Sequence, residues 1–217
     1  MWTCNAQGVL ESELLKQFPW VWHGFGTRLS GDWPGDYTSL KQIHSDLVHV
    51  AQSRGCLGEG DALVTGTPGI RIGVRTADCV PLLLAGSEHQ AVAAVHAGWR
   101  GTIANIAKRA VQRMQEEFGS DPSRIHAALG PSIGQCCFEV GPEVAREFHE
   151  YFSDASSRTH IDLVDVNVRQ LLDAGVARER IDISGICTVC DAERMHSFRR
   201  DKQSSGRMVA AIGIAQQ

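Results

Sequence analysis

Two short apolar runs, Pro81–Ala85 and Ala91–Val95, constrain the fold of this chain more than any other feature. They lie in the stretch TADCVPLLLAGSEHQAVAAVHAGWRGT, which covers residues 76–102. Short Val-, Leu- and Ala-rich runs are typical of buried strands. Cys79 stands just before the first run, and His96 directly follows the second. If the two runs pair in one sheet, a thiol, an imidazole and the start of the following helix meet in one place.

The remaining elements favour an α+β layered domain over a strict βαβ alternation, because predicted strands come in runs early and mix with helices later. A chain of 217 residues is long enough for one sizeable core, so we expect a single domain over residues 1–217. Strands are predicted at Val21–Phe25, Leu47–Ala51, Ala62–Thr65, Ile70–Thr76, Val80–Ala85, Ala91–His96, Ile125–Leu129, Ile181–Gly185 and Met208–Ile214. Helices are predicted at Thr102–Phe118, with Gly119 as its stop, and at Gly141–Phe152 and Leu163–Ala174.

Composition and charge narrow the classes of partner. The net charge is −4 and no basic stripe is present, which argues against nucleic acid. No apolar run approaches the ~20 residues that span a bilayer, so we expect no membrane partner. The first residues lack a basic segment followed by an apolar one, so we expect no signal peptide and a cytoplasmic location. The seven cysteines are then expected to be reduced thiols.

His44, Cys79 and His96 form a possible metal site. Two imidazoles and a thiolate are ligands that zinc prefers, and three protein ligands leave a position open for water or substrate. The intervals of 35 and 17 residues are not diagnostic spacings. Taken singly, His96 also fits a buried histidine bonded to a carbonyl, Cys79 a small buried residue, and His44 a surface loop residue.

Two segments are possible anion sites. Gly98-Trp99-Arg100-Gly101 precedes a helix, whose first turn has unpaired N–H groups, and Arg100 would add a fork suited to phosphate. The alternative is a glycine turn with a surface arginine. The second segment, HSFRRDKQSSGRM, is a solvated face or a polar loop that closes on an anion, and it contains Arg199, Arg200, Lys202 and Arg207.

Four polar residues within apolar motifs either orient a metal ligand or cap a turn: Gln42, Asp61, Asp78 and Glu139. For Asp61 the turn cap is the favoured interpretation.

Cys187-x-x-Cys190 has metal-ligand spacing, but no second half of a structural site is evident nearby. Cys136 and Cys137 would face opposite ways on a strand. We therefore expect no structural zinc from these cysteines.

The ordered motifs KQIHS, GDALVT, TADCVPLLL, AVHAGWRGT, LGPSIGQCCFEVG and CTVCDAERMHSFRRDKQSSGRM resemble the bacterial YfiH/YlmD proteins. This family is also called the laccase-domain or polyphenol oxidase family, and it includes peptidoglycan editing factors and an animal purine-metabolism protein. The resemblance extends from about Gly24 to Gly213. One departure lies before KQIHS, where only DWPGDYTSL replaces a longer family segment with an Asn-Arg-bearing helix.

The resemblance implies a four-layer α/β/β/α sandwich, shared with the catalytic domain of cytotoxic necrotizing toxins. It also implies zinc ligands at His44, Cys79 and His96. Family members are described as phosphorolysing adenosine, inosine and methylthioadenosine and as deaminating adenosine. Other assignments are copper-dependent oxidation of phenols and removal of a wrong amino acid from a UDP-muramyl cell-wall precursor.

The residues favour zinc over copper, because a multicopper relay needs further histidine ligands. Of the nine histidines none forms an H-x-H pair, and three belong to the proposed zinc site. The prediction is therefore a metal-dependent purine nucleoside phosphorylase and adenosine deaminase, a monomer or homodimer, which binds a purine nucleoside and phosphate. Gln42, Arg100, Arg199, Arg200 and Arg207 are the expected substrate contacts, with Asp78 and Glu139 behind the metal ligands. The alternatives are a hydrolase in which Cys79 is the nucleophile and His96 its base, and a non-enzymatic binding module.

Overall fold

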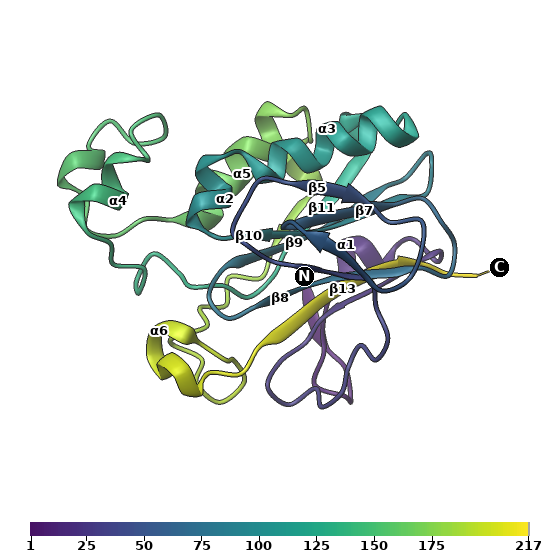
Figure 1. The fold of residues 1–217 in the computed structure, drawn as a ribbon, viewed down its shortest axis with the longest axis horizontal. Coiled ribbons are helices and arrows are strands. Elements are labelled where there is room, and N and C mark those ends of the chain that lie inside the picture. Colours follow the sequence, from purple (N-terminus) through teal and green to yellow (C-terminus); the bar gives the residue numbers. More distant parts are fainter. Residues whose placement is uncertain (217) are drawn as a thin grey trace.

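Two β-sheets lie face to face in the computed structural model, and helices cover the outer side of one of them (Figure 1). The structure describes residues 1–216, apart from the side chain of Ser156. The α+β class predicted from the sequence is confirmed. Within the described residues, no helix combines the length and apolar character that crossing a bilayer requires.

The two apolar runs form β9 and β10, the two adjacent central strands of the six-stranded sheet. Its order is β12–β11–β9–β10–β7–β5, with β12 Ile181–Ile183, β11 Ile125–Leu129, β9 Val80–Gly86, β10 Ala91–Ala97, β7 Ala62–Thr65 and β5 Val48–Val50. The five-stranded sheet has the order β1–β2–β3–β13–β8, with β1 Trp2–Cys4, β2 Leu10–Ser12, β3 Val21–Phe25, β13 Met208–Ile214 and β8 Arg71–Thr76. A small parallel pair joins β4 Ser39–Lys41 and β6 Cys56–Glu59.

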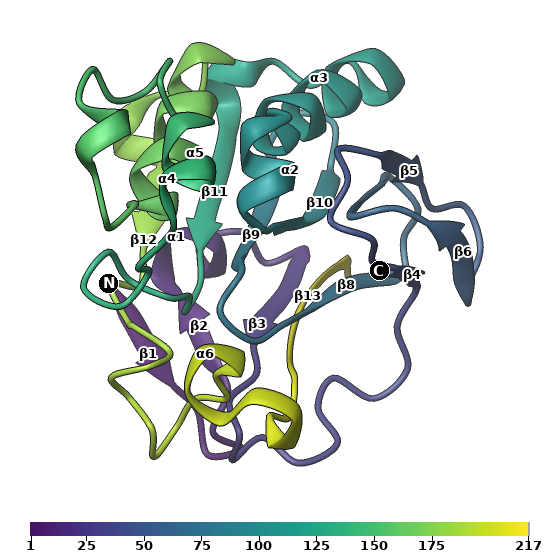
Figure 2. The same cartoon turned by 60° about the vertical axis from the view of Figure 1, so that its left-hand side comes forward.

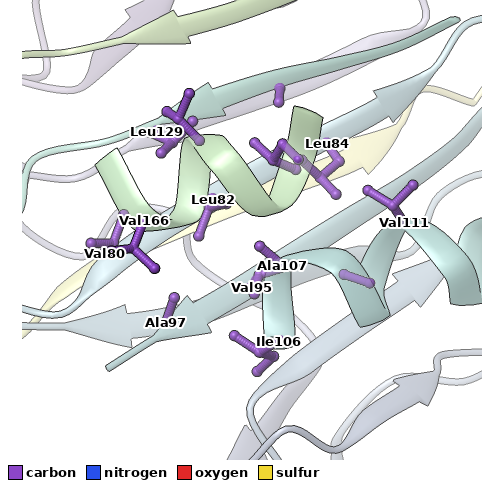
Figure 3. Packing of buried hydrophobic residues seen from close by; sticks show 14 of the residues in the cluster. Val80, Leu82, Leu84, Val95, Ala97, Ile106, Ala107, Val111, Leu129 and Val166 are labelled. Carbon is purple, nitrogen blue, oxygen red and sulfur yellow. The ribbon is translucent and has the colours of Figure 1, made fainter. Parts of the chain in front are cut away.

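The longer helices lie over the six-stranded sheet (Figure 2). The α-helices are α1 Glu13–Lys16, α2 Trp99–Ile103, α3 Ile106–Phe118, α4 Pro142–Arg146, α5 Leu163–Asp173 and α6 Phe198–Asp201. Four 3-10 turns complete the list: η1 Pro122–Arg124, η2 Ala155–Ser157, η3 Arg178–Arg180 and η4 Lys202–Ser204. Figure 3 shows Val166 of α5 near Leu82 of β9, Val111 of α3 near Leu84 of β9, and Ala107 of α3 near Val95 of β10.

The other face of the six-stranded sheet packs against the five-stranded sheet. Along β9 and β10 alternate residues belong to the two clusters: Leu82 and Leu84 face the helices, while Leu83 and Ala94 face β8 and β13. This alternation is the period of a strand, and burial on both faces explains why the two runs are apolar throughout.

A loop covers the outer face of the five-stranded sheet. Trp33 stacks on Trp22 of β3 with ring centroids 5.5 Å apart, and a Cβ added at Gly73 of β8 would lie 2.8 Å from the Tyr37 ring. The described residues therefore form α/β/β layers. A loop covers this face in the described residues, so the second helical layer of the four-layer prediction is not observed there.

The predicted helix Thr102–Phe118 is wrong as one element. It is two helices, α2 and α3, and Asn105 between them has φ 63°. Asparagine tolerates this left-handed conformation. The helical spacing of apolar residues continues through Asn105, so the sequence pattern does not reveal the break between α2 and α3. Gly119 is the α3 C-cap with φ 66°, as predicted. The predicted helix Gly141–Phe152 is shorter, with only α4 in α-helical form.

Candidate metal centre and active site

The strand pairing brings Cys79 and His96 together, as the sequence predicts. β9 and β10 are antiparallel, and the register places His96 opposite Pro81, two residues after Cys79. His44 arrives from the loop between β4 and β5, because β5 pairs with β7, which is the other neighbour of β10. One ligand atom from each of the three residues lies within 4.8 Å of the other two.

The three side chains differ in exposure in a way that leaves one side open. His96 is 3% exposed, Cys79 is half-buried and His44 is exposed. The two imidazole rings meet edge to face, with centroids 4.9 Å apart. Gly98 allows this approach, because a Cβ there would lie 2.8 Å from the His44 ring and 3.1 Å from the Cys79 sulfur.

Asp61 connects two of the three ligands, and its role is larger than the turn cap favoured from the sequence. Its fully buried carboxylate accepts a bond from His96 Nδ1 at 2.8 Å. It also accepts bonds from the backbone N–H groups of Ile43, His44 and Ser45 at 3.2, 3.0 and 2.6 Å and from the Ser45 hydroxyl at 2.7 Å. These bonds hold the His44 loop, where His44 has φ 60°. Only the β7–β10 register, which the sequence does not state, places Asp61 here.

The charges in the centre favour a cation. Against the opposing effect of burial, contacts with His44 and His96 lower the pKa of Cys79 to about 6. Against the same effect, bonds to His96 and Ser45 lower the pKa of Asp61 to about 2. Asp61 and Cys79 in turn raise the pKa of His96 to about 9, although burial opposes this. Two anions therefore face one imidazolium near neutral pH.

These residues fit a metal ion. The Nδ1 atom of His96 is engaged by Asp61, so Nε2 is left for the centre, which is the carboxylate–histidine arrangement of many zinc sites. Two nitrogens and one thiolate are the donors zinc prefers, and a three-ligand site keeps a position open. The three ligand atoms, which all lie within 4.8 Å of one another, are close enough to share one ion.

A cavity of about 790 Å³ opens over the centre. This volume suits a small-molecule ligand. Ile133, Phe138 and Phe198 form apolar wall, and Asp78 is the one carboxylate among the described lining residues. Five cations also line the cavity: Lys41, Arg75, Arg199, Lys202 and Arg207. Within residues 1–216, no carboxylate lies in ion-pair range of the last four, whereas Lys41 pairs with Glu59 at 2.8 Å.

The C-terminal charge run contributes directly to this cavity. Arg199 donates its backbone N–H to Asp78 at 2.6 Å and its guanidinium to the carbonyls of Cys137 and Glu139 at 3.2 and 3.0 Å. Asp78 also accepts from the Thr188 hydroxyl at 2.6 Å. Asp78 thus holds the wall of the cavity and makes no bond to the three proposed ligands, although it directly precedes Cys79.

Of the other predicted contacts, Gln42 lines the cavity, whereas Arg100, Arg200 and Glu139 do not. Gln42 lines the cavity, but its side-chain amide makes paired bonds of 2.8 Å with the Arg75 backbone and so anchors the loop. Arg200 bonds carbonyls of residues 188, 189 and 195 and does not line the cavity. Arg100 is exposed, lies over the Trp99 ring and is also outside the cavity. The Glu139 side chain is exposed and contributes only its carbonyl.

The sequence argument against a structural zinc site assumes that Cys136 and Cys137 lie in a strand, and this assumption is wrong. Cys136 and Cys137 lie in a turn, where the N–H groups of residues 137 and 138 both donate to the Gly134 carbonyl, so the strand rule does not apply. The sulfurs of Cys136, Cys137, Cys187 and Cys190 all lie within 4.8 Å of one another. The missing half of the Cys187-x-x-Cys190 pair is therefore present.

Comparison with known proteins finds relatives along most of the chain. Residues 28–215 match a family model described as "Multi-copper polyphenol oxidoreductase laccase". A "Purine nucleoside phosphorylase" of Deinococcus radiodurans is 44% identical over an alignment of 184 positions, which covers 82% of this chain and 70% of that protein. "Adenosine deaminase RL5" from an unknown prokaryotic organism is 45% identical over an alignment of 196 positions, which covers 82% of this chain and 74% of that protein.

The crystal structure of YlmD from Geobacillus stearothermophilus superposes with a TM-score of 0.88 at 26% identity, covering 99% of each chain. The motifs, the sheet architecture and these matches agree along most of the sequence. The chain belongs to the YfiH/YlmD family, the laccase-domain family of the matching model.

Proposed function

We propose that this chain is a single-domain, metal-dependent purine nucleoside phosphorylase that also deaminates adenosine. The observation that carries the proposal is the position of the His44, Cys79 and His96 centre beside a cavity rich in unpaired cations. The names of the Deinococcus radiodurans and RL5 relatives support the two activities.

The metal ligands have distinct tasks. His96, held by Asp61, would present Nε2 to the ion, while Cys79 supplies a thiolate and His44 closes the site from the solvent side. A bound zinc ion would supply Lewis-acid chemistry and a hydroxide available near neutral pH. The buried Asp61 keeps the His96 ring in one orientation, so the donor atoms need no rearrangement when substrate enters.

The cavity walls offer places for both substrates. The exposed Phe198 ring offers apolar surface for a purine, and the Arg207 guanidinium carbon lies 5.8 Å from its centroid. Arg75, Lys202 and Arg207 have no carboxylate in ion-pair range within the described residues, so their charge remains for phosphate. Arg199 adds a fourth cation, and the guanidinium groups of Arg199 and Arg207 each also bond two backbone carbonyls. The phosphate site proposed here therefore replaces the Gly98–Gly101 turn considered from the sequence.

A hydrolase remains the second candidate, because one observation favours it. The lowered pKa of Cys79, with His96 beside it, is also the arrangement of a Cys–His nucleophile pair, which would cleave an amide such as that of a muramyl precursor. Alkylation separates the two: a metal-bound thiolate resists modification until the metal is removed, whereas a free nucleophile is modified at once.

Product analysis tests the proposal. The purified, zinc-loaded protein is incubated with inosine or adenosine, with and without phosphate, and base, ribose 1-phosphate and ammonia are measured. We expect base and ribose 1-phosphate in equal amounts only when phosphate is present. Base release without phosphate would refute phosphorolysis, and ammonia without base would leave only the deaminase. Arg207→Ala should raise the KM for phosphate, whereas Arg100→Ala, an arginine outside the cavity, should not.

A further inference from the structure

Four cysteines from two segments that are distant in sequence converge at one point. Cys136 and Cys137 lie in the turn between β11 and α4, and Cys187 and Cys190 lie between β12 and α6. The two segments are joined by an isolated parallel bridge between Ser132 and Cys187. Thr188 N–H also donates to the Ser132 carbonyl at 2.9 Å. The parallel pairing of β11 and β12 is thus prolonged, and it delivers both pairs of thiols to one point.

The sulfur separations are those of ligands around one ion. Cys190 lies 3.8 Å from the sulfur of Cys136 and 3.5 Å from that of Cys137, and the Cys136 and Cys137 sulfurs are 3.5 Å apart. A tetrahedral zinc with Zn–S bonds of about 2.3 Å has sulfurs about 3.8 Å apart. All four thiols are free in the structure. We propose that Cys136, Cys137, Cys187 and Cys190 bind a structural zinc ion as a second metal site, separate from the His44 centre.

The surroundings suit thiolates bound to a cation. The Gly134 N–H donates to the Cys187 sulfur at 3.3 Å, and a Cβ at Gly134 would lie 3.3 Å from the Cys136 sulfur, so a glycine lets the backbone approach. Thiols this close resist joint ionisation unless a cation compensates their charge. Binding forms four S–Zn bonds as four S–H bonds ionise, and the protons go to solvent.

The ion would clamp the wall of the substrate cavity. Phe138, which follows the first thiol pair, lines the cavity. The Cys137 carbonyl accepts from the Arg199 guanidinium. Thr188, between the second pair, bonds Asp78. The site therefore ties together the two segments that hold Phe138 and Arg199, and its role is structural rather than catalytic.

Metal content and thiol protection test the proposal on the intact protein. Zinc per chain is measured for the wild type, for Cys187→Ser/Cys190→Ser and for the matched control Cys4→Ser/Cys56→Ser, which removes two exposed thiols outside the cluster. We expect the cluster variant to hold one zinc fewer than the wild type and the control to hold the same number. Cobalt added to metal-free His96→Ala, whose other centre has lost a ligand, should give strong thiolate-to-cobalt charge-transfer bands, whereas the cluster variant should show only the weaker band of the single Cys79 thiolate.

A second measurement uses only the wild type, so it remains valid if the double mutant fails to fold. Iodoacetamide labelling of the wild type is followed at each cysteine by mass spectrometry, with and without added zinc. We expect zinc to slow labelling at the four cluster cysteines at least tenfold and to leave Cys4 and Cys56 unchanged. Equal labelling rates with and without zinc, or disulfides among the four, would overturn the proposal.

Discussion

Asp61→Asn removes one charge from the buried residue that organises the metal centre. The carboxylate accepts five bonds, from three backbone N–H groups, the Ser45 hydroxyl and His96 Nδ1. An asparagine keeps the shape but turns one acceptor into a donor. In one orientation its NH₂ group faces the His44 N–H. In the other it faces the N–H groups of Ile43 and Ser45.

The loss of unfolding free energy in Asp61→Asn can be worked out from these five hydrogen bonds. A hydrogen bond to a charged group contributes about 1.5–3 kcal/mol, and a buried donor left without a partner costs a similar amount. Losing one or two such bonds should therefore lower the free energy of unfolding of the metal-free protein by about 3 kcal/mol. If the NH₂ group donates to Nδ1, His96 is held in the wrong tautomer, and zinc affinity should fall about 10–100-fold.

Urea unfolding and competition with a zinc chelator measure the two effects. Asp121→Asn is a matched control, because this exposed carboxylate caps a single N–H, that of Ser123, at 2.9 Å. Asparagine is an equally good cap there, so a change within about 0.5 kcal/mol is expected. The reasoning is refuted if Asp61→Asn matches this control in stability and retains zinc affinity within twofold.

Three further perturbations test other parts of the account. Gly98→Ala places a Cβ 2.8 Å from the His44 ring, so zinc affinity measured by chelator competition should fall at least tenfold; an unchanged affinity would mean that His44 is not a ligand. Burial lowers the pKa of His23 to about 4, so its contribution to stability is present above pH 6.5 and is lost as the pH falls towards 4. Between pH 7.5 and 4.5 the wild type should lose about 2 kcal/mol more unfolding free energy than His23→Gln, and parallel urea curves would contradict this. Lys202→Ala and Arg207→Ala should each raise the KM for phosphate about 5–10-fold with little change for the nucleoside, and equal changes in both constants would remove them from the phosphate site.

The sequence predicts that Cys79 and His96 lie together, because their positions depend on two strands that are close in sequence. Two apolar runs close in sequence pair as neighbours, so Cys79 and His96 had to meet if the runs were strands. Asp61 depends instead on the register of β7 against β10, and a carboxylate that follows a glycine is equally typical of a turn. Its role depends on the three backbone N–H groups that donate to its carboxylate.

Local conformation explains the other differences. The strand rule predicts that Cys136 and Cys137 face opposite ways, but they lie in a turn, where adjacent side chains can reach the same point. Asn105 interrupts a helix whose apolar spacing is continuous, because a single left-handed residue leaves no trace in periodicity. Arg100 lies in the glycine-flanked turn that is expected to direct it towards phosphate. Its side chain instead stacks on Trp99, with the guanidinium carbon 4.3 Å from the ring centroid. Side-chain direction at such positions depends on tertiary packing rather than on neighbours in sequence.

The central claim is that the His44, Cys79 and His96 centre performs phosphate-dependent cleavage of a purine nucleoside. Its most direct test is the rate of base release from inosine, with and without phosphate, in zinc-loaded wild type and in His96→Ala, with the zinc at this centre quantified in both. The account predicts that release requires phosphate and falls at least a hundredfold in His96→Ala, together with the loss of one zinc. Phosphorolysis at the full rate in His96→Ala that lacks this zinc would contradict it.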